Sequence, residues 1–294
     1  MNKVTSVSQN RPLLIRKVAA LRDALGAARR AGKRIGLAPT MGALHEGHLS
    51  LVRASRRECD LTVVSIYVNP TQFAPHEDLA RYPRTLDADL DLLTDGGAEV
   101  VFAPDDEEMY PAGNATWVEV GAVAEPWEGQ CRPGHFRGVA TVVLKLFNIV
   151  APDAAYFGQK DYQQTAVVRR MVADLNVPVD IRICPIVREP DGLAMSSRNR
   201  YLAPVARQQA LCLWRSLGRA DELVQQGERR AATIAAAMRE VLAAAGATIE
   251  YVALADPQTL APVERLSGRT LAALAVRIDG VRLIDNCLLE MKEE

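Results

Sequence analysis

Short apolar runs alternate with helical segments along the first part of the chain, and this alternation limits the possible folds more than any other feature. The apolar runs that predict buried strands are residues 34–38, 61–68 and 99–103. The segments whose apolar residues favour helix are residues 11–30, 48–59 and 78–94. Strands that alternate with helices form a parallel sheet, because each right-handed crossover between strands is made by a helix. We therefore expect an α/β fold built on a Rossmann-like parallel sheet.

The same alternation continues to about residue 187, and then the pattern changes. The remaining elements expected before that point are helices at 139–150 and 163–175 and strands at 155–157 and 179–187. After it come an alanine-rich helical region at 204–245 and strands at 249–255, 272–278 and 281–288. Asp279-Gly280, between the last two strands, is a strong hairpin signal. We expect a Rossmann-like domain over 1–186 and a smaller C-terminal α+β domain over 187–294.

Charge and cysteine usage exclude several classes of protein. The chain has 35 basic and 36 acidic residues, so we expect neither nucleic acid nor an anionic membrane as a partner. Five scattered cysteines without a C-x-x-C motif argue against a disulfide framework or a cysteine zinc site. We find neither a signal-like apolar run at the start nor a stretch of membrane-spanning length, and we expect a cytoplasmic protein.

The strongest local signal is His45-Glu46-Gly47-His48, which follows a predicted strand and opens a predicted helix. Ligands of parallel sheets bind at the carboxyl ends of strands, and free N–H groups at a helix start attract phosphate. The two imidazoles could donate hydrogen bonds to the oxygen between the α- and β-phosphates of a nucleotide. Two alternatives stay open: ordinary surface or packing histidines, and a zinc site, although the spacing differs from H-E-x-x-H.

A second signal is the loop Met195-Ser196-Ser197-Arg198, whose hydroxyl groups and arginine suit a flap over phosphates. Its plainer interpretation is a solvated loop before the helix near Pro204. Together with the histidine turn, however, it resembles the paired ATP-binding signatures of the superfamily that includes class I aminoacyl-tRNA synthetases and related nucleotidyltransferases. In that superfamily the two motifs hold ATP from opposite sides.

A third group of polar residues follows the strand predicted at 155–157. Lys160 could neutralise phosphate charge, and Asp161 could hold ribose or magnesium, or simply cap the next helix. Gln164, together with Gln72 after the strand at 61–68, offers neutral amides that could orient a small hydroxy acid. Each glutamine taken alone could equally be a surface residue.

Five ordered blocks resemble the pantothenate synthetase family, whose members are also called pantoate–β-alanine ligases. The blocks are residues 39–48, 69–73, 135–139, 157–161 and 195–198. The similarity is collinear from about residue 12 to about 288. One position departs from the family pattern, because Gln159 stands where members commonly have glutamate.

The resemblance implies a role for each matching residue. His48 would be the catalytic proton donor with His45 beside it, and Lys160 and Arg198 would neutralise charge. Gln72 would bind pantoate and β-alanine and Gln164 would bind pantoate, while Arg132 and His135 would lie near the substrate cavity. The residues implied in ATP binding are Pro39, Thr40, Met41, Gly42, Ala43, Leu44, His45, Glu46, Gly47, His48, Gly158, Gln159, Lys160, Asp161, Val187, Met195, Ser196, Ser197 and Arg198.

The activity so implied is a two-step ligation. Pantoate and ATP form pantoyl adenylate and pyrophosphate, and β-alanine then displaces AMP to give pantothenate. Magnesium would arrive with ATP, without a tight protein site, and the family implies a homodimer. Three rival functions remain at this point: a nucleotidyltransferase that keeps AMP in its product, a synthetase fragment that acts on tRNA, and a non-catalytic nucleotide-binding regulator.

Overall fold

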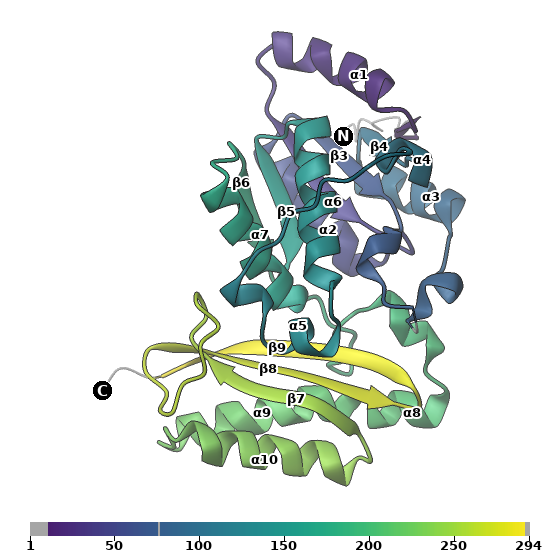
Figure 1. The fold of residues 1–294 in the computed structure, drawn as a ribbon. Helices are drawn as coiled ribbons and strands as arrows, with labels where there is room; N and C mark the ends of the chain where they lie inside the picture. The colour runs from purple at the N-terminus through teal and green to yellow at the C-terminus, as the bar shows by residue number, and fades with distance from the viewer. Residues whose placement is uncertain (1–10, 76, 292–294) are drawn as a thin grey trace, which may run out of the picture.

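The computed structural model describes residues 11–75 and 77–291, and its larger part is a parallel sheet with helices on both faces (Figure 1). The strands of this sheet are β1 (Leu13–Ile15), β2 (Ile35–Thr40), β3 (Leu61–Ile66), β4 (Val100–Phe102), β5 (Ala154–Gly158) and β6 (Asp180–Cys184). They lie in the order β1-β4-β3-β2-β5-β6, and every neighbouring pair is parallel. The predicted Rossmann-like α/β sheet is confirmed.

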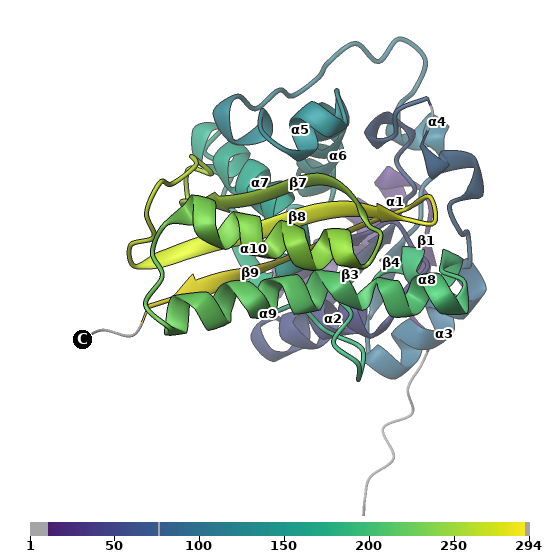
Figure 2. The same cartoon turned by 90° about the horizontal axis from the view of Figure 1, so that it is seen from below.

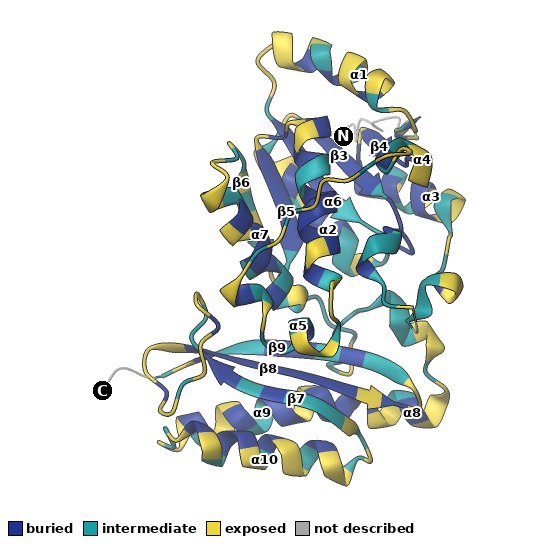
Figure 3. Cartoon of the chain, viewed as in Figure 1, coloured by how far each residue is buried: buried dark blue, intermediate teal, exposed yellow. Residues whose placement is uncertain are grey.

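Two apolar cores form on the two faces of the sheet because successive strand residues point to opposite sides. The helices that pack on one face are α1 (Val18–Arg30), α6 (His135–Val150) and α7 (Tyr162–Asp174), and those on the other are α2 (Glu46–Glu58) and α3 (Leu86–Gly96). Leu37 and Val63 face the first set of helices, while their neighbours Ala38 and Val64 face the second. Figure 3 shows the resulting buried sheet between helices whose outer faces are exposed.

The chain reverses its direction across the sheet between β2 and β5. From β2 it moves through β3 to β4, and it returns to pair β5 on the opposite side of β2. The loops that leave the carboxyl ends of β2 and β5 therefore diverge and leave a crevice between them. Doubly wound sheets bind their ligands at such a switch point. The turn that carries His45 and His48 and the turn that carries Lys160 both start at this crevice.

The C-terminal part forms a second layered unit below the parallel sheet (Figures 1 and 2). Its elements are the helices α8 (Pro204–Gln209), α9 (Leu211–Gln225) and α10 (Ala231–Ala244) and the antiparallel strands β7 (Thr248–Ala255), β8 (Arg269–Ile278) and β9 (Val281–Glu290). Helices α9 and α10 cover one face of the sheet, and the other face is turned toward the parallel-sheet unit. The hairpin predicted at Asp279-Gly280 joins β8 to β9, and both of its residues have positive φ.

Polar contacts connect the two units where the antiparallel sheet approaches the short helix α5 (Glu128–Cys131). The guanidinium of Arg282 on β9 donates two hydrogen bonds, of 2.6 and 2.8 Å, to the buried carboxylate of Glu128. The hydroxyl of Tyr251 on β7 donates to the same carboxylate at 2.9 Å. Arg282 and Tyr251 therefore help to hold the C-terminal sheet against the larger unit.

The structure corrects two of the predicted helices. Residues 13–15 are not helical, because they pair with β4 as an edge strand, and helix α1 begins only at Val18, whose N–H donates to the Glu108 carboxylate at 2.8 Å. The helix expected at 78–94 is interrupted at Pro83: a single 3-10 turn, η2 (Asp78–Arg81), precedes it and α3 follows it. Proline lacks the N–H group that a continuous helix would need there.

The remaining predicted elements are present with shifted bounds. The strand expected at 179–187 ends at Cys184, and the helical region expected at 204–245 consists of α8, α9 and α10. In the part of the chain that the structure covers, we find no helix that combines the length and the apolar character needed to cross a membrane.

Candidate active site

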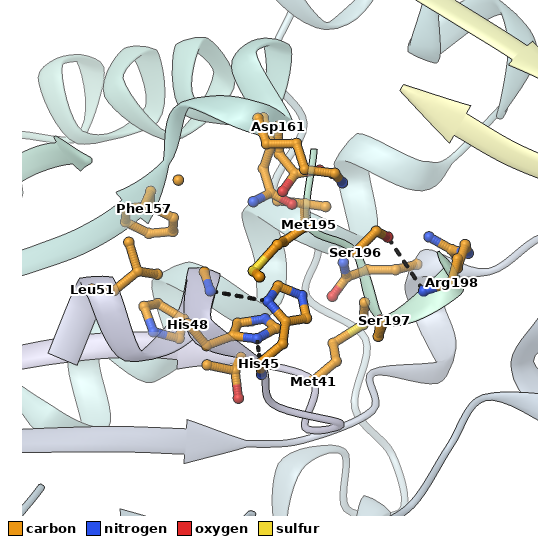
Figure 4. Close-up of a pocket in the computed structure, with 18 of the residues that line it drawn as sticks. Met41, His45, His48, Leu51, Phe157, Asp161, Met195, Ser196, Ser197 and Arg198 are labelled. Carbon is orange, nitrogen blue, oxygen red and sulfur yellow. Dashed lines mark hydrogen bonds and ion pairs between the residues drawn. The ribbon is translucent and has the colours of Figure 1, made fainter. Parts of the chain in front are cut away.

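A cavity of about 220 Å³ opens at the carboxyl ends of β2 and β5 and is closed from the opposite side by the loop after β6. Figure 4 shows His45 and His48 on one wall and Met195, Ser196 and Arg198 on the facing loop. The predicted residues that line this cavity are Pro39, Thr40, Met41, His45, Gly47, His48, Gln72, Arg132, His135, Gly158, Lys160, Asp161, Gln164, Val187, Met195, Ser196, Ser197 and Arg198. Segments that are far apart in the sequence thus meet around one space.

The two histidines accept hydrogen bonds from the backbone at the start of α2. His45 Nδ1 accepts from the Gly47 N–H at 3.1 Å, and His48 Nδ1 accepts from the His45 N–H at 3.3 Å. A neutral imidazole that accepts at Nδ1 carries its proton on Nε2. With ring centroids 4.1 Å apart, the pair therefore offers two Nε2–H donors at the cavity.

The environment keeps both imidazoles neutral near pH 7. Partial burial in the cavity wall, aided by the charge of Lys160, lowers the pKa of His45 to about 4. Burial, the neighbouring His45 and Lys160 lower the pKa of His48 to about 3. Both side chains are thus poised to donate hydrogen bonds without carrying a charge of their own.

The backbone N–H groups of the turn before α2 donate to other protein groups rather than to the cavity. The N–H groups of Ala43 and Leu44 donate to the carboxylate of Asp89 at 3.0 and 2.8 Å, and the Gly42 N–H donates to the Thr40 hydroxyl at 3.2 Å. The N–H groups of these three residues, which precede the helix start, are therefore not free to bind a phosphate. Their place in the site is to shape the turn that carries the histidines.

Two other residues from the predicted ATP site also lie outside the cavity lining. The carboxylate of Glu46 pairs with Arg53, which lies about two turns further along α2. The side-chain amide of Gln159 donates to Asn286 on β9 at 3.3 Å. The position that departs from the family pattern thus points its polar group at the C-terminal sheet.

The two predicted cations line the same cavity as the histidines, and both have acidic partners. Lys160 Nζ lies 3.9 Å from a carboxylate oxygen of Asp161. Arg198 donates two hydrogen bonds of 3.0 Å to Asp78, and the Tyr82 hydroxyl lies 3.3 Å from the hydroxyl of Ser197. Asp78 and Tyr82 were missed because the pattern placed them inside a helix.

A tight polar network surrounds Gln72 in η1 (Pro70–Gln72). Its side-chain carbonyl accepts from Asn69 at 2.9 Å, and its backbone carbonyl accepts from His135 Nδ1 at 2.8 Å and from Arg132 at 3.3 Å. Arg132 is itself held by two hydrogen bonds, of 2.6 and 2.8 Å, to Glu77. The predicted pair Arg132 and His135 therefore lies at the cavity and braces the Gln72 backbone.

The ring of His135 is also neutral. A carbonyl can only accept, so Nδ1 of His135 carries the proton and Nε2 accepts from Arg132 at 3.0 Å. Burial and the Arg132 charge lower the pKa of His135 to about 4. Asn69, which completes this network, is buried and was not singled out from the sequence, although it belongs to the quoted 69–73 block.

Over residues 11–75 and 77–291, we find no group of three His, Cys, Asp or Glu side chains that could hold a metal ion. The zinc alternative for His45 and His48 has no third ligand of this kind there. The Nδ1 atoms of both rings are also engaged with backbone N–H groups.

Comparison with known proteins decides the family. Residues 13–288 match the family model described as pantoate–β-alanine ligase. The chain belongs to the pantoate–β-alanine ligase family. A pantothenate synthetase from Moorella thermoacetica is 56% identical over 281 residues, which cover 95% of this chain and 99% of that protein.

Solved structures of pantoate–β-alanine ligases extend the match to the fold. A pantothenate synthetase from Thermus thermophilus is 48% identical, with a TM-score of 0.90 over 94% of this chain and 98% of that one. A pantoate–β-alanine ligase from Francisella tularensis, complexed with βγ-ATP and β-alanine, is 34% identical, with a TM-score of 0.79 over 94% and 97% of the two chains.

Proposed function

We propose that this chain condenses pantoate with β-alanine to form pantothenate, using ATP and releasing AMP and pyrophosphate. Membership of the pantoate–β-alanine ligase family supports the overall reaction. The observation that carries the residue assignments is the convergence of His45, His48, Lys160 and Arg198 on one cavity that also contains Gln72 and Gln164.

In the first step, a carboxylate oxygen of pantoate attacks the α-phosphorus of ATP. A bond forms between that oxygen and the phosphorus, and the bond to the bridging oxygen breaks, so that pyrophosphate leaves and pantoyl adenylate remains. This chemistry needs positioning and charge neutralisation rather than a protein nucleophile. Lys160 and Arg198 supply positive charge. Magnesium would enter as part of the magnesium–ATP substrate, and Asp161 is an acidic residue of the cavity lining that could meet it.

The neutral histidines act on the phosphate oxygens. Their Nε2–H groups donate to the oxygen that gains negative charge as pyrophosphate leaves, and such aimed donors lower the barrier. Of the two, His48 is the residue that the family resemblance assigns as the proton donor. The phosphates raise the pKa of both rings on binding because negative charge stabilises an imidazolium.

In the second step, the unprotonated amine of β-alanine attacks the acyl carbon of the adenylate. The carbon–nitrogen bond forms, the bond from carbon to the phosphate oxygen breaks, and AMP and the amine proton depart. Gln72 and Gln164 orient pantoate through their amides, and Gln72 also lies near the incoming amine. Among the described residues, no group accepts a hydrogen bond from the side-chain amide nitrogen of Gln72, which leaves its hydrogens for a substrate oxygen.

We also propose a division of labour between two domains, 1–186 and 187–294. Most of the buried apolar residues from Leu193 onward form a core of their own, which supports a separate C-terminal unit. Its first loop, with Met195 to Arg198, closes over the adenylate and excludes water, because an adenylate hydrolyses readily. We also propose that the chain belongs to the superfamily that includes class I aminoacyl-tRNA synthetases. The support is that this loop faces His45 and His48 across the cavity.

A homodimer in the cytoplasm is the assembly and location that the family resemblance implies for this chain. Sedimentation analysis of the purified protein tests the first point. A mass of one chain, rather than two, across micromolar concentrations would rule out the dimer.

The decisive experiment is exchange of labelled pyrophosphate into ATP in the absence of β-alanine. Exchange that depends on pantoate demonstrates reversible formation of pantoyl adenylate. A chain that binds ATP without such exchange would be a regulator, and a product that retains AMP would identify a nucleotidyltransferase. A salt-sensitive shift of tRNA would instead favour the synthetase fragment.

A further inference from the structure

Lys160 sits on η4 (Gln159–Asp161), a single 3-10 turn between β5 and α7. One such turn has few internal hydrogen bonds, so outside contacts must fix its position. For Gln159 and Lys160, those contacts come from the C-terminal antiparallel sheet.

The contacting residue is Asn286 on β9, which lies 126 residues after Lys160 in the sequence. The side-chain amide nitrogen of Asn286 donates to the backbone carbonyl of Gln159 at 3.0 Å and to that of Lys160 at 2.9 Å. Its side-chain oxygen accepts from the Gln159 amide at 3.3 Å. The nitrogen faces two acceptors and the oxygen faces one donor, so all three bonds require the same orientation of the Asn286 amide.

Asn286 is itself held firmly. Only 2% of the residue is exposed, and it pairs with Ala273 on β8, the central strand of the antiparallel sheet. Its backbone N–H donates to the carboxylate of Asp285 at 2.8 Å, and that carboxylate accepts from Arg188 at 2.7 and 3.0 Å. Because the Asn286 side chain is fixed in the sheet, its hydrogen bonds fix the η4 turn relative to that sheet.

Asn286 is absent from the lining of the nucleotide cavity, whereas Lys160 lines it. Asn286 and Lys160 both line a smaller neighbouring cavity, and the contact that connects Asn286 to the nucleotide cavity is the η4 turn that it holds. We propose that Asn286 is a positioning residue for Lys160, through which docking of the C-terminal sheet sets the lysine against the triphosphate. This inference rests on the proposed function for its catalytic consequence, but not for its effect on ATP binding.

The test is a double-mutant cycle on the full chain with Asn286→Ala, Lys160→Ala and the double variant. Pantoate-dependent exchange of pyrophosphate is measured, and in parallel the Kd of magnesium–ATP without pantoate. We expect Asn286→Ala to slow exchange and weaken ATP binding about tenfold, since small misplacements of a catalytic group carry such costs. In the Lys160→Ala background the same change should cost less than about twofold, because the group that it positions is gone.

A matched control removes a different hydrogen bond between the same two units. Tyr162→Phe deletes the 3.0 Å bond from the tyrosine hydroxyl to the Pro257 carbonyl and leaves the η4 carbonyls untouched. It should retain exchange and ATP binding within about twofold of the unmodified chain. If it instead reproduces the Asn286→Ala losses, the effect belongs to domain contact in general and the positioning role is lost.

A second variant guards against simple unfolding. Asn286→Asp keeps the shape but turns an oxygen toward two carbonyl oxygens, so it should weaken ATP binding at least as much as Asn286→Ala, with an unfolding transition still present. Full ATP affinity in either variant, or a double variant whose loss equals the product of the single losses, overturns the proposal. If the unmodified chain shows no pantoate-dependent exchange, the proposed function fails, and the ATP-binding cycle still decides the role of Asn286.

Discussion

Arg198 and Asp78 form a two-bond ion pair across 120 residues of sequence, with both donor–acceptor distances at 3.0 Å. The pair connects the loop after β6 to the 3-10 turn η2, and its arginine lines the nucleotide cavity. Although burial alone would raise the pKa of the Asp78 carboxyl, the Arg198 guanidinium lowers that pKa below its ordinary value. A phosphate group that enters the cavity therefore meets an arginine whose charge is already partly balanced.

This pairing predicts an unusual rescue. Arg198→Ala should weaken ATP binding about a hundredfold, since it removes a charge-assisted contact and leaves the Asp78 carboxylate unpaired beside the phosphates. Adding Asp78→Asn should restore part of that loss, about tenfold, because the repelling charge is removed. Titration of magnesium–ATP into the unmodified chain and these two variants measures the effect. A double variant that binds no better than Arg198→Ala would show that Asp78 does not repel the nucleotide.

The neutral histidine donors predict a large effect at His48. His48→Ala should reduce pantoate-dependent exchange by a factor on the order of 10²–10³, the typical cost of one lost donor at a developing charge. The unfolding midpoint of the variant serves as the control for structure. Turnover close to that of the unmodified chain would remove His48 from the catalytic machinery.

Three imidazoles predict a loss of stability in mild acid. His45, His48 and His135 have pKa values lowered to about 4, 3 and 4 in the folded chain, whereas an unfolded histidine titrates near 6.5. Between these values the unfolded chain binds more protons, so stability is greatest above pH 6.5 and falls as pH drops toward 4. Each histidine contributes up to about a tenfold change in the folding equilibrium constant per pH unit.

Urea unfolding at pH 7, 6 and 5 measures this slope. His48→Gln should lower the slope because glutamine takes up no proton on unfolding. An equal slope in the variant and the unmodified chain would assign the acid sensitivity to other groups.

Asp89 stabilises the turn that precedes His45, and its replacement should therefore destabilise the protein. Its buried carboxylate accepts hydrogen bonds from the backbone N–H groups of Ala43 and Leu44 through different oxygens. Ala43 has a φ of 50°, which residues other than glycine rarely adopt. Asp89→Asn turns an amide nitrogen toward one of these N–H donors. The free energy of unfolding should fall by about 1–3 kcal/mol, and exchange should slow with it.

The matched control for this change lies two residues along the same helix. Asp91 is exposed and only approaches Arg11 at 3.4 Å, so Asp91→Asn should leave stability within about 0.5 kcal/mol. Chemical denaturation of both variants provides the comparison. Equal stabilities for the two would mean that the Asp89 hydrogen bonds do not support the turn.

The sequence by itself determined the alternation of strands and helices, the C-terminal hairpin and the two facing motifs, because these depend on local periodicity and on residues close together in the chain. Tertiary structure alone decided that residues 13–15 are an edge strand, since pairing with β4 outweighs a weak helical pattern. It also decided the partners of Arg198, of the Ala43 turn and of Lys160: Asp78, Asp89 and Asn286 lie 46 to 126 residues from the groups they hold. Hydrogen bonds over such separations leave no trace in local pattern, because only the packed fold brings donor and acceptor together.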